Sequence, residues 1–440
     1  MNFVLHTLKL TSSGVASAAM NATTNAYVPR VAERELQSCL EAAGAVLIEG
    51  PRACGKTEMA KRVAASAVFL DVDHMMREAI DFDPALVLDG KTPRLIDEWQ
   101  TKPAIWNHVR RAVDARAGRG HFILTGSAVP PDDITRHTGA GRIIRLHLRP
   151  MSLFELGRST GNISLRDTLK GVPARSLAAE LSARTLAELI CIGGWPEYRL
   201  SPPNQAQRAN WNHVQDICRA DLQRVDGIRR DPDRVLRLLR SLARNVATCA
   251  SLATIVRDTA GPGGSLGDET ARGYLTALER LMVVEDQPPW SPRLRSRSRL
   301  RRSHKRHFVD PSLAVAALRA GPQHLLRDFE WFGFLFESLV LRDLRVYAQA
   351  MDADVFHYRD NTGLEVDAIV DAGPDRWAAF EIKLGTGRID DAARSLLKFV
   401  DRVDTERCGE PAALGVIVGT GYGYTRRDGV AVIPIGALGP

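Results

Sequence analysis

Residues 50–57 read Gly50-Pro51-Arg52-Ala53-Cys54-Gly55-Lys56-Thr57, a complete G-x-x-x-x-G-K-[ST] sequence. The apolar run Ala45-Val46-Leu47-Ile48 precedes it, and a helical pattern follows it. A buried strand, a glycine-rich turn and a helix in this order direct backbone N–H groups and a positive helix end at one concavity, which suits a polyphosphate. We therefore expect residues 50–57 to bind a nucleoside triphosphate, with Lys56 at the β/γ-phosphates and Thr57 at Mg²⁺.

Two acidic residues end the third of five expected strands. The strand patterns fall at 45–49, 67–71, 94–97, 121–125 and 142–148. Their alternation with helices predicts a parallel sheet with helices on both faces. Asp97 and Glu98 leave their strand at the carboxyl edge, where open α/β sheets bind ligands. We expect Asp97 to hold Mg²⁺ and Glu98 to polarise the water that attacks the γ-phosphate.

Other polar residues are candidates for the same site. Thr125 and Ser127 end the fourth strand, and either one senses the γ-phosphate, orients the attacking water or caps the next helix. Arg136, Arg142 and Arg145 are candidates for an arginine that stabilises charge on the transferred phosphoryl group. Arg142 is our choice among the three, and an ordinary surface role fits it equally well.

The order of these motifs resembles that of a known family. The motifs after the phosphate loop are Leu-Ile-Asp-Glu-Trp-Gln (95–100), Ile-Leu-Thr-Gly-Ser (123–127), Gly-Arg-Ile-Ile-Arg-Leu (141–146) and Pro-Met-Ser-Leu-Phe-Glu-Leu (150–156). From about residue 28 to its end, the chain is similar to uncharacterised bacterial and archaeal ATP-binding proteins with an AAA-type core and a conserved C-terminal domain of unknown function. The resemblance implies an additional-strand P-loop ATPase with strand order 5-1-4-3-2, ATP as the nucleotide, and Glu98 as a catalytic residue.

Composition sets limits on the class of protein. The chain has 440 residues, of which 45% are hydrophobic, so it is long enough for about three domains. A net charge of +7 favours an acidic partner such as nucleic acid, although arginine-rich coding gives the same bias. No apolar run reaches the roughly 18 residues of a membrane span. The six scattered cysteines lack a C-x-x-C pair and indicate reduced thiols, so we expect a soluble, cytoplasmic protein.

Helical periodicity replaces the strand pattern after Pro150. Helical patterns occur at 177–181, 186–190, 233–258 and 268–285. The sequence Gly-Gly-Trp-Pro-Glu at 193–197 predicts a helix stop with a buried tryptophan. A short strand is expected at 283–286. Helices followed by a ribbon are the outline of a winged helix-turn-helix, which serves either nucleic-acid binding or protein docking.

The segment 293–306 is densely basic, with eight Lys or Arg among its fourteen residues. Such charge stays extended unless a polyanion neutralises it. We expect this ribbon to lie along a DNA backbone with salt-dependent affinity, and a solvated loop is the alternative.

Four charged residues near the C-terminus form a candidate metal site. The expected strands there are 355–359, 364–370, 377–383 and 413–418. Asp367 lies in one strand, Glu381 and Lys383 share one face of the next, and Glu337 lies on a preceding helix. Strand pairing would bring Asp367 beside Glu381 and Lys383. Asp367 and Glu381 holding Mg²⁺, with Lys383 orienting water, would suit a phosphodiesterase.

This part of the chain resembles the PD-(D/E)xK restriction-endonuclease-like fold, with Asp367 and Glu381-x-Lys383 as the matching positions. Val366 stands where the motif name has proline. The resemblance implies an α/β nuclease fold, while ion pairing without cleavage is the alternative.

We therefore expect an α/β multi-domain protein and three possible functions. The expected parts are a flexible tail (1–27), a P-loop ATPase core (28–150), a helical lid or linker (151–228), a winged-helix-like module with the basic ribbon (229–322) and a PD-(D/E)xK-like domain (323–440). The first function is an ATP-hydrolysing switch coupled to DNA. The second is an ATP-licensed, Mg²⁺-dependent nuclease. The third is a non-enzymatic scaffold in which ATP controls assembly as a homo-oligomer or with a protein partner.

Overall fold

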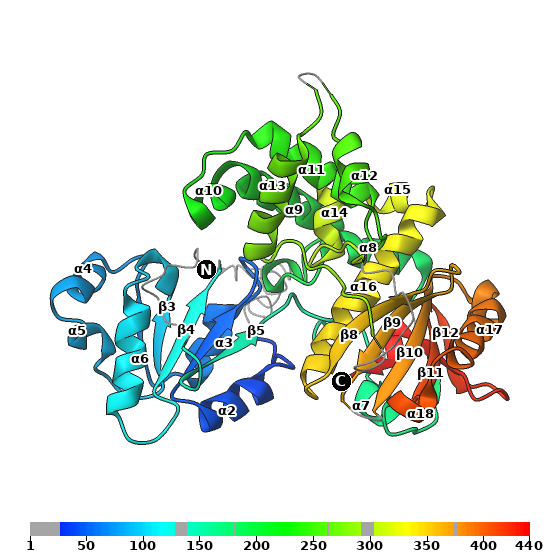
Figure 1. Cartoon of the computed structure of the whole chain (residues 1–440), viewed down its shortest axis with the longest axis horizontal. Coiled ribbons are helices and arrows are strands. Elements are labelled where there is room, and N and C mark those ends of the chain that lie inside the picture. Colours follow the sequence, from blue (N-terminus) through cyan, green and yellow to red (C-terminus); the bar gives the residue numbers. More distant parts are fainter. Residues whose placement is uncertain (1–26, 128–138, 180, 262–263, 292–302, 374–375) are drawn as a thin grey trace, which may run out of the picture.

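Three groups of elements meet at a junction in the middle of the molecule, as Figure 1 shows: an α/β core at the left, a group of helices at the top and a second α/β module at the right. The computed structural model describes residues 27–127, 139–179, 181–261, 264–291, 303–373 and 376–440. Within these ranges, no helix combines the length and the apolar character that crossing a membrane requires.

The core contains a five-stranded parallel sheet with the order β5-β1-β4-β3-β2, which confirms the order 5-1-4-3-2. The strands are β1 (Ala45–Glu49), β2 (Ser66–Phe69), β3 (Arg94–Asp97), β4 (Phe122–Gly126) and β5 (Ile143–His147). Side chains of β1 alternate between the two faces of the sheet. Val46 and Ile48 accordingly belong to one apolar cluster, and Leu47 belongs to another. The first cluster includes residues of α2 (Glu33–Ala42) and α3 (Lys56–Val63).

Helices on the second face of the core sheet complete its burial. They are α4 (His74–Phe82), α5 (Ala85–Leu88) and α6 (Ile105–Ala115). Trp106 and Val109 of α6 join Leu47 in the second cluster. The two-sided cover explains why the central strands read as continuous apolar runs.

The helical group follows the sequence prediction in most places. Its helices are α8 (Ala183–Ile192), α9 (Pro203–Asp216), α10 (Leu222–Asp226), α11 (Pro232–Arg244), α12 (Leu252–Arg257), α13 (Asp268–Arg280), α14 (Pro311–Ala317) and α15 (Pro322–Leu325). A π-helical turn, Ile217–Asp221, joins α9 to α10. The side chain of Trp195 is fully buried after the end of α8, as expected.

The ribbon that follows α13 consists of single bridges rather than continuous strands. Val284 pairs with Phe308, and Gln287 pairs with Lys305, both in the antiparallel sense. Residues 292–302, which would form the tip of a wing, lie outside the described residues. A winged helix-turn-helix that binds nucleic acid therefore stays a prediction.

The helix expected at 177–181 is wrong. Residues Ser176–Ala179 form strand β7, which pairs with β12 (Gly421–Thr425). The short strand β6 (Ile163–Ser164) likewise pairs with β14 (Leu438–Gly439). Pairing with a distant strand edge outweighs the weak local helical pattern. Residues 163–179 are therefore not the all-helical segment we expected, and α7 (Leu165–Thr168) lies beside the right-hand module in Figure 1.

The second α/β module is built on a seven-stranded mixed sheet with the order β7-β12-β13-β11-β10-β9-β8. Its remaining elements are α16 (Phe329–Gln349), β8 (Asp354–Arg359), β9 (Glu365–Asp371), β10 (Trp377–Lys383), α17 (Ile389–Val400), α18 (Thr405–Cys408), β11 (Ala413–Val418) and β13 (Ala431–Pro434). Strands β8, β9 and β10 are antiparallel, whereas β10 and β11 are parallel. Alternate residues of β10 face α16 and α17: Phe380 clusters with Phe336, and Trp377 clusters with Phe399.

Candidate functional site

The phosphate loop connects β1 to α3 through a strained turn. Ala53 and Gly55 both have positive φ, 64° and 101°. Gly50 has no room for a side chain, since a Cβ atom there would lie 2.1 Å from the carbonyl oxygen of Leu148. Lys56 is buried at the start of α3, and its Nζ donates to the carbonyl oxygens of Gly50 and Pro51 at 2.9 Å each. The lysine is thus held over the loop.

Polar side chains from three elements meet beside this loop. Thr57 Oγ1 donates to Asp97 Oδ1 at 2.9 Å, and Thr125 Oγ1 donates to the same oxygen. The two contacts bring together the start of α3 and the carboxyl ends of β3 and β4. Thr125 therefore orients the carboxylate of Asp97 in this structure.

Glu98 has a backbone conformation that suits a functional residue. It lies directly after β3 with φ 53° and ψ 44°, a left-handed conformation that costs a non-glycine residue about 1 kcal/mol or more. Gln100 Nε2 donates to Glu98 Oε2 and lies 3.4 Å from Ser127 Oγ, so it connects the ends of β3 and β4. Burial raises the pKa of Glu98, against the opposing positive charge of Lys56. A raised pKa makes the carboxylate a stronger base.

The residues present fit a magnesium–nucleotide complex. A hydroxyl and a carboxylate 2.9 Å apart, Thr57 and Asp97, form the oxygen donor set that Mg²⁺ prefers. Lys56 is the residue next to Thr57. Positive φ at two positions of the loop 50–57 curves its backbone, and such a curve suits an anion.

A cavity of about 560 Å³ opens between this edge of the core and the helical group. Its lining includes Arg52 and Glu98 from the core, and Asp221 and Arg224 from the helical group. Arg52 Nη1 lies 3.2 Å from Asp221 Oδ1, and Arg224 Nη1 lies 3.4 Å from the same oxygen. Burial raises the pKa of Asp221, and the two arginines lower it. The helical group thus contributes one carboxylate and one arginine to the cavity beside the phosphate loop.

Arg142 does not belong to the phosphate-loop site of its own chain. The carbonyl oxygen of Arg142 accepts a hydrogen bond from Ala45 N, the first residue of β1, which lies at the amino edge of the sheet. Its guanidinium forms an ion pair with Asp114 at 2.7 Å. Arg142 precedes a parallel strand, and such positions lie opposite the carboxyl edge, so a charge-stabilising role of Arg142 stays a prediction that only a second copy of the chain could fulfil. Arg145 pairs with Glu49 at 3.0 Å, and Arg136 lies outside the described residues.

A buried polar network connects the phosphate loop to the central junction. Arg30 Nη1 donates to the carbonyl oxygen of Cys54 at 2.8 Å, and Arg30 Nε lies 3.0 Å from Glu155 Oε1. Glu155 Oε2 in turn accepts from Ser152 N at 2.7 Å. The next residue, Leu153, donates from its N–H to Asp343 of α16 at 3.0 Å.

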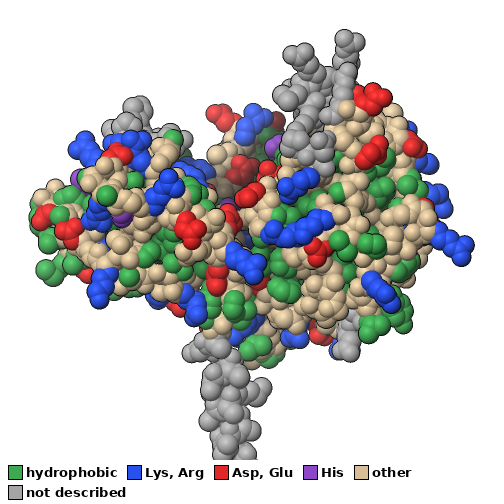
Figure 2. All heavy atoms as spheres, turned by 90° about the horizontal axis from the view of Figure 1, so that it is seen from below, with side chains coloured by type: hydrophobic (Ala, Val, Ile, Leu, Met, Phe, Trp, Pro, Cys, Tyr) green, Lys and Arg blue, Asp and Glu red, His purple; other side chains and the backbone are tan. Residues whose placement is uncertain are grey.

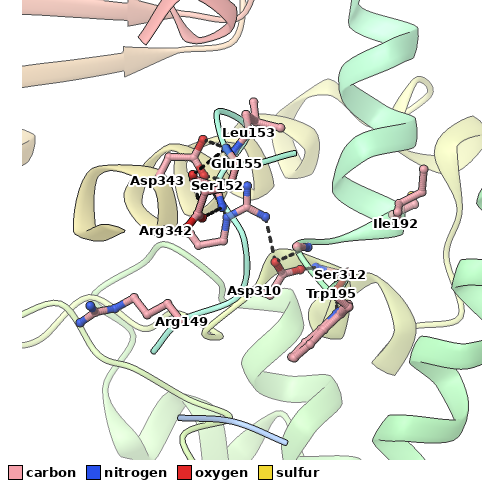
Figure 3. Close-up of polar contacts among 12 residues, drawn as sticks. Arg149, Ser152, Leu153, Glu155, Ile192, Trp195, Asp310, Ser312, Arg342 and Asp343 are labelled. Atoms are coloured by element: carbon pink, nitrogen blue, oxygen red, sulfur yellow. Dashed lines mark hydrogen bonds and ion pairs between the residues drawn. The ribbon is translucent and has the colours of Figure 1, made fainter. Parts of the chain in front are cut away.

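Figure 3 shows how this network continues between α16 and the helical group. Arg342 lies 2.7 Å from Asp343 and 2.9 Å from Asp310, and all three side chains are buried. Asp310 Oδ2 also accepts from Gly194 N at 2.9 Å, while Trp195 Nε1 donates to Ser312 Oγ at 3.0 Å. The motifs 150–156 and 193–197 thus meet at the junction, and removal of one partner would leave a buried charge uncompensated.

A further polar interface joins the core to the second α/β module. Arg149 Nη2 lies 2.6 Å from Glu285 Oε1, and Arg149 Nη1 donates to Gln349 of α16 at 2.6 Å. These residues line a cavity of about 660 Å³ with charged groups of both signs. Figure 2 shows a hollow between the left and right parts of the molecule, with acidic and basic side chains around it.

The four charged residues predicted near the C-terminus come together as expected. Lys383 Nζ lies 2.6 Å from Glu381 Oε2 and 2.9 Å from Asp367 Oδ2. Glu337 of α16 reaches the same cluster through Lys305, whose Nζ lies 2.7 Å from Glu337 Oε1 and 3.2 Å from Asp367 Oδ1. Sequence reasoning missed Lys305, because it assigned the whole basic segment to the surface.

The pKa values of this cluster reflect burial and close pairing. Burial raises the pKa of Glu337 to about 7, and burial with the neighbouring Asp367 raises that of Glu381 to about 8. Burial alone would raise the pKa of Asp367, but Lys305 and Lys383 outweigh it and hold the pKa well below its usual range.

These residues do not fit Mg²⁺. Among the residues that the structure describes, no three acidic, histidine or cysteine side chains are grouped as metal ligands. Two lysines already neutralise Asp367, and the raised pKa of Glu381 favours its protonated form at neutral pH. The expectation that Asp367 and Glu381 hold a metal ion therefore has no support in the geometry.

The basic segment is only partly described. Lys305 is buried in the cluster, and Arg306 pairs with Asp286 at 2.5 Å, so neither side chain is available to a phosphate backbone in this structure. The other six basic residues of 293–306 lie outside the described residues.

Comparisons with known proteins support a three-part division. Residues 42–157 match the family described as AAA domain, and residues 183–324 and 332–438 match two families described as domains of unknown function. Two uncharacterised proteins, from Mycobacterium bovis and Mycobacterium tuberculosis, are each 26% identical over 412 residues, which cover 92% of this chain and 83% of the relative. A Walker-type ATPase of Pyrococcus abyssi aligns with 65% of this chain and 94% of its own at a TM-score of 0.41 and 14% identity.

Proposed function

We propose that this protein binds and hydrolyses ATP and acts as a nucleotide-dependent switch, because residues 42–157 match the AAA domain family. The observation that carries the proposal is the convergence of Thr57, Asp97 and Glu98 beside the phosphate loop. Thr57 bonds to Asp97 at 2.9 Å, and Glu98 lies in the adjoining cavity. This set supplies a cation site and a base next to a polyphosphate site.

Each residue has a distinct role in the proposed reaction. Lys56 and the backbone N–H groups of the phosphate loop would hold the phosphates, and Thr57 and Asp97 would hold Mg²⁺. When bound, Mg²⁺ offsets negative charge on the phosphate oxygens. Glu98 accepts a proton from the attacking water, and Gln100 fixes the position of its carboxylate.

The helical group senses the nucleotide through Asp221. In this structure Asp221 pairs with Arg52 of the phosphate loop and with Arg224 of α10. Phosphate groups bind arginine through the same kind of charge-assisted hydrogen bond as a carboxylate. Bound ATP therefore competes with Asp221 for the two arginines, and this competition changes the contact between the core and the helical group.

Coupling to DNA is the further part of the proposal. The net charge of +7 and the basic residues of 293–302 supply the attraction to phosphate backbones. Lys305, which follows that segment, pairs with Glu337 and Asp367 of the second α/β module. DNA binding would then change ATP turnover through elements that also contact the core.

The test is ATP turnover by the full chain with Mg²⁺, with and without double-stranded DNA, at two salt concentrations. We expect salt-sensitive stimulation by DNA, loss of ATP binding in Lys56→Ala, and loss of turnover with retained binding in Glu98→Gln. ATP binding without turnover under every condition would instead favour the scaffold whose assembly ATP controls. Turnover that DNA leaves unchanged would retain the ATPase and remove the DNA coupling.

A further inference from the structure

The charged cluster of the second α/β module contains a buried lysine between two acidic residues of the candidate metal site. Lys305 Nζ lies between Glu337 Oε1 and Asp367 Oδ1, at 2.7 and 3.2 Å. These are distances of ammonium–carboxylate hydrogen bonds, and they exceed the roughly 2.1 Å of a Mg²⁺–oxygen contact. A divalent ion could not occupy this place without displacing the ammonium group.

The backbone holds Lys305 in this position. Lys305 N donates to Gln287 O at 3.0 Å, and Gln287 N donates to Lys305 O at 2.9 Å. The buried amide of Gln287 also donates to the carbonyl oxygen of Asp367 at 3.0 Å. Gln287 therefore forms hydrogen bonds with the backbone of both Lys305 and Asp367, and these bonds fix the distance between the two residues.

Withdrawal of Lys305 would be unfavourable. Its side chain is 5% exposed, and the side chains of Glu337 and Asp367 are each 11% exposed. Removing one partner of a buried ion pair leaves the other charge without compensation, which strongly destabilises the folded chain. Burial alone would lower the pKa of Lys305, but the two carboxylates hold it well above its ordinary value, so the ammonium stays charged.

We propose that Lys305 is a tethered cation that replaces a divalent metal ion, so that this module holds α16, β9 and the 303–308 segment together without metal and does not cleave nucleic acid. Lys383 adds a second positive charge on the other oxygen of Asp367. The ion pairs of this cluster thus link residues 303–308 to the second α/β module. The proposal is independent of the ATPase, because none of these residues lines the phosphate-loop cavity.

The test is calorimetric titration of the nucleotide-free full chain with MnCl₂. We expect Lys305→Met, which removes the charge and keeps most of the length, to bind Mn²⁺ at least about tenfold more tightly than the wild type. The gain should disappear in the double variant Lys305→Met/Asp367→Asn. Lys383→Met is the matched control: it removes the same charge from a lysine that is 28% exposed, leaves Lys305 in place, and should show no gain.

Two results would overturn the proposal. One is a folded Lys305→Met protein, checked by circular dichroism, that binds Mn²⁺ no better than the wild type. The other result needs no Lys305 variant. It is that the wild type cleaves plasmid DNA in the presence of Mg²⁺ or Mn²⁺ and that Asp367→Asn abolishes this cleavage. Absence of cleavage, together with wild-type Mn²⁺ binding that Asp367→Asn leaves unchanged, supports the proposal even where Lys305→Met does not fold.

Discussion

At the scale of single residues, Asp221 is the carboxylate that we expect to compete with a bound nucleotide. It pairs with Arg52 and Arg224 beside the phosphate loop. Asp221→Asn removes a negative charge from the cavity and frees both arginines, so we expect ATP to bind more tightly, by up to about tenfold or 1.4 kcal/mol. The measurement is equilibrium binding of a fluorescent ATP analogue.

Asp216→Asn is the control for this prediction. It makes the same change of charge in the preceding helix, at an exposed residue that does not line the cavity, and should leave binding nearly unchanged. Weaker binding in Asp221→Asn would mean that Asp221 helps to hold the nucleotide complex rather than competing with it.

At the scale of elements, strand β7 depends on a glycine in its partner β12. A Cβ atom at Gly423 would lie 2.6 Å from Ile163 Cδ1 and 3.0 Å from Ser176 N. Gly423→Val would therefore push β6 and β7 away from β12, and we expect a loss of stability of about 1 to 3 kcal/mol. Thermal unfolding followed by circular dichroism measures the loss.

Gly333→Ala serves as the comparison for this change. It also adds a side chain to a glycine, but inside helix α16 with nothing within 4 Å, and should be neutral or stabilising by about 0.5 to 1 kcal/mol. A Gly423→Val protein with the melting temperature of the wild type would show that β7 is not firmly packed on β12.

The sequence predicted elements whose signals are local. Residues 50–57, the five core strands, and the neighbourhood of Asp367 and Glu381 followed from short motifs and from alternation along strands. What it missed depends on distant partners: β7 is a strand because β12 lies beside it, and Lys305 is buried because Glu337 and Asp367 neutralise it. Composition alone assigned Lys305 to the surface, since a basic run usually is solvated.

At the scale of the whole molecule, buried titratable groups predict that stability is greatest near pH 6.5. Burial lowers the pKa of four described histidines from the ordinary 6.5. The pKa falls to about 4 for His147, His213 and His357, and well below 6.5 for His307. The unfolded chain binds more protons at these groups than the folded chain does, so the free energy of unfolding falls as pH drops below 6.5.

Above pH 6.5 the free energy of unfolding changes with pH in the opposite sense. Glu337 and Glu381, with pKa raised from 4.5 to about 7 and about 8, bind protons more tightly in the folded chain. Their contribution is lost as pH rises to 8, at about 1.4 kcal/mol per unit of pKa difference for each group. Melting temperatures between pH 5 and pH 9 test both limbs, and Glu381→Gln should flatten the alkaline one. A melting temperature that rises steadily through pH 8 would contradict the prediction.

The pairing of β6 and β7 with the last strands has a consequence for synthesis of the chain. Ala174 N donates to Thr425 Oγ1 across 251 residues, and Ser159 Oγ donates to Leu438 O across 279. At about 5 to 20 residues per second, the ribosome needs on the order of 10 to 50 seconds to make the intervening chain. During that interval β7 has no partner strand, while the core strands β1 to β5 are already complete. The nascent protein therefore has an unpaired strand to protect, and we expect slower translation of residues 180–420 to increase its need for a chaperone.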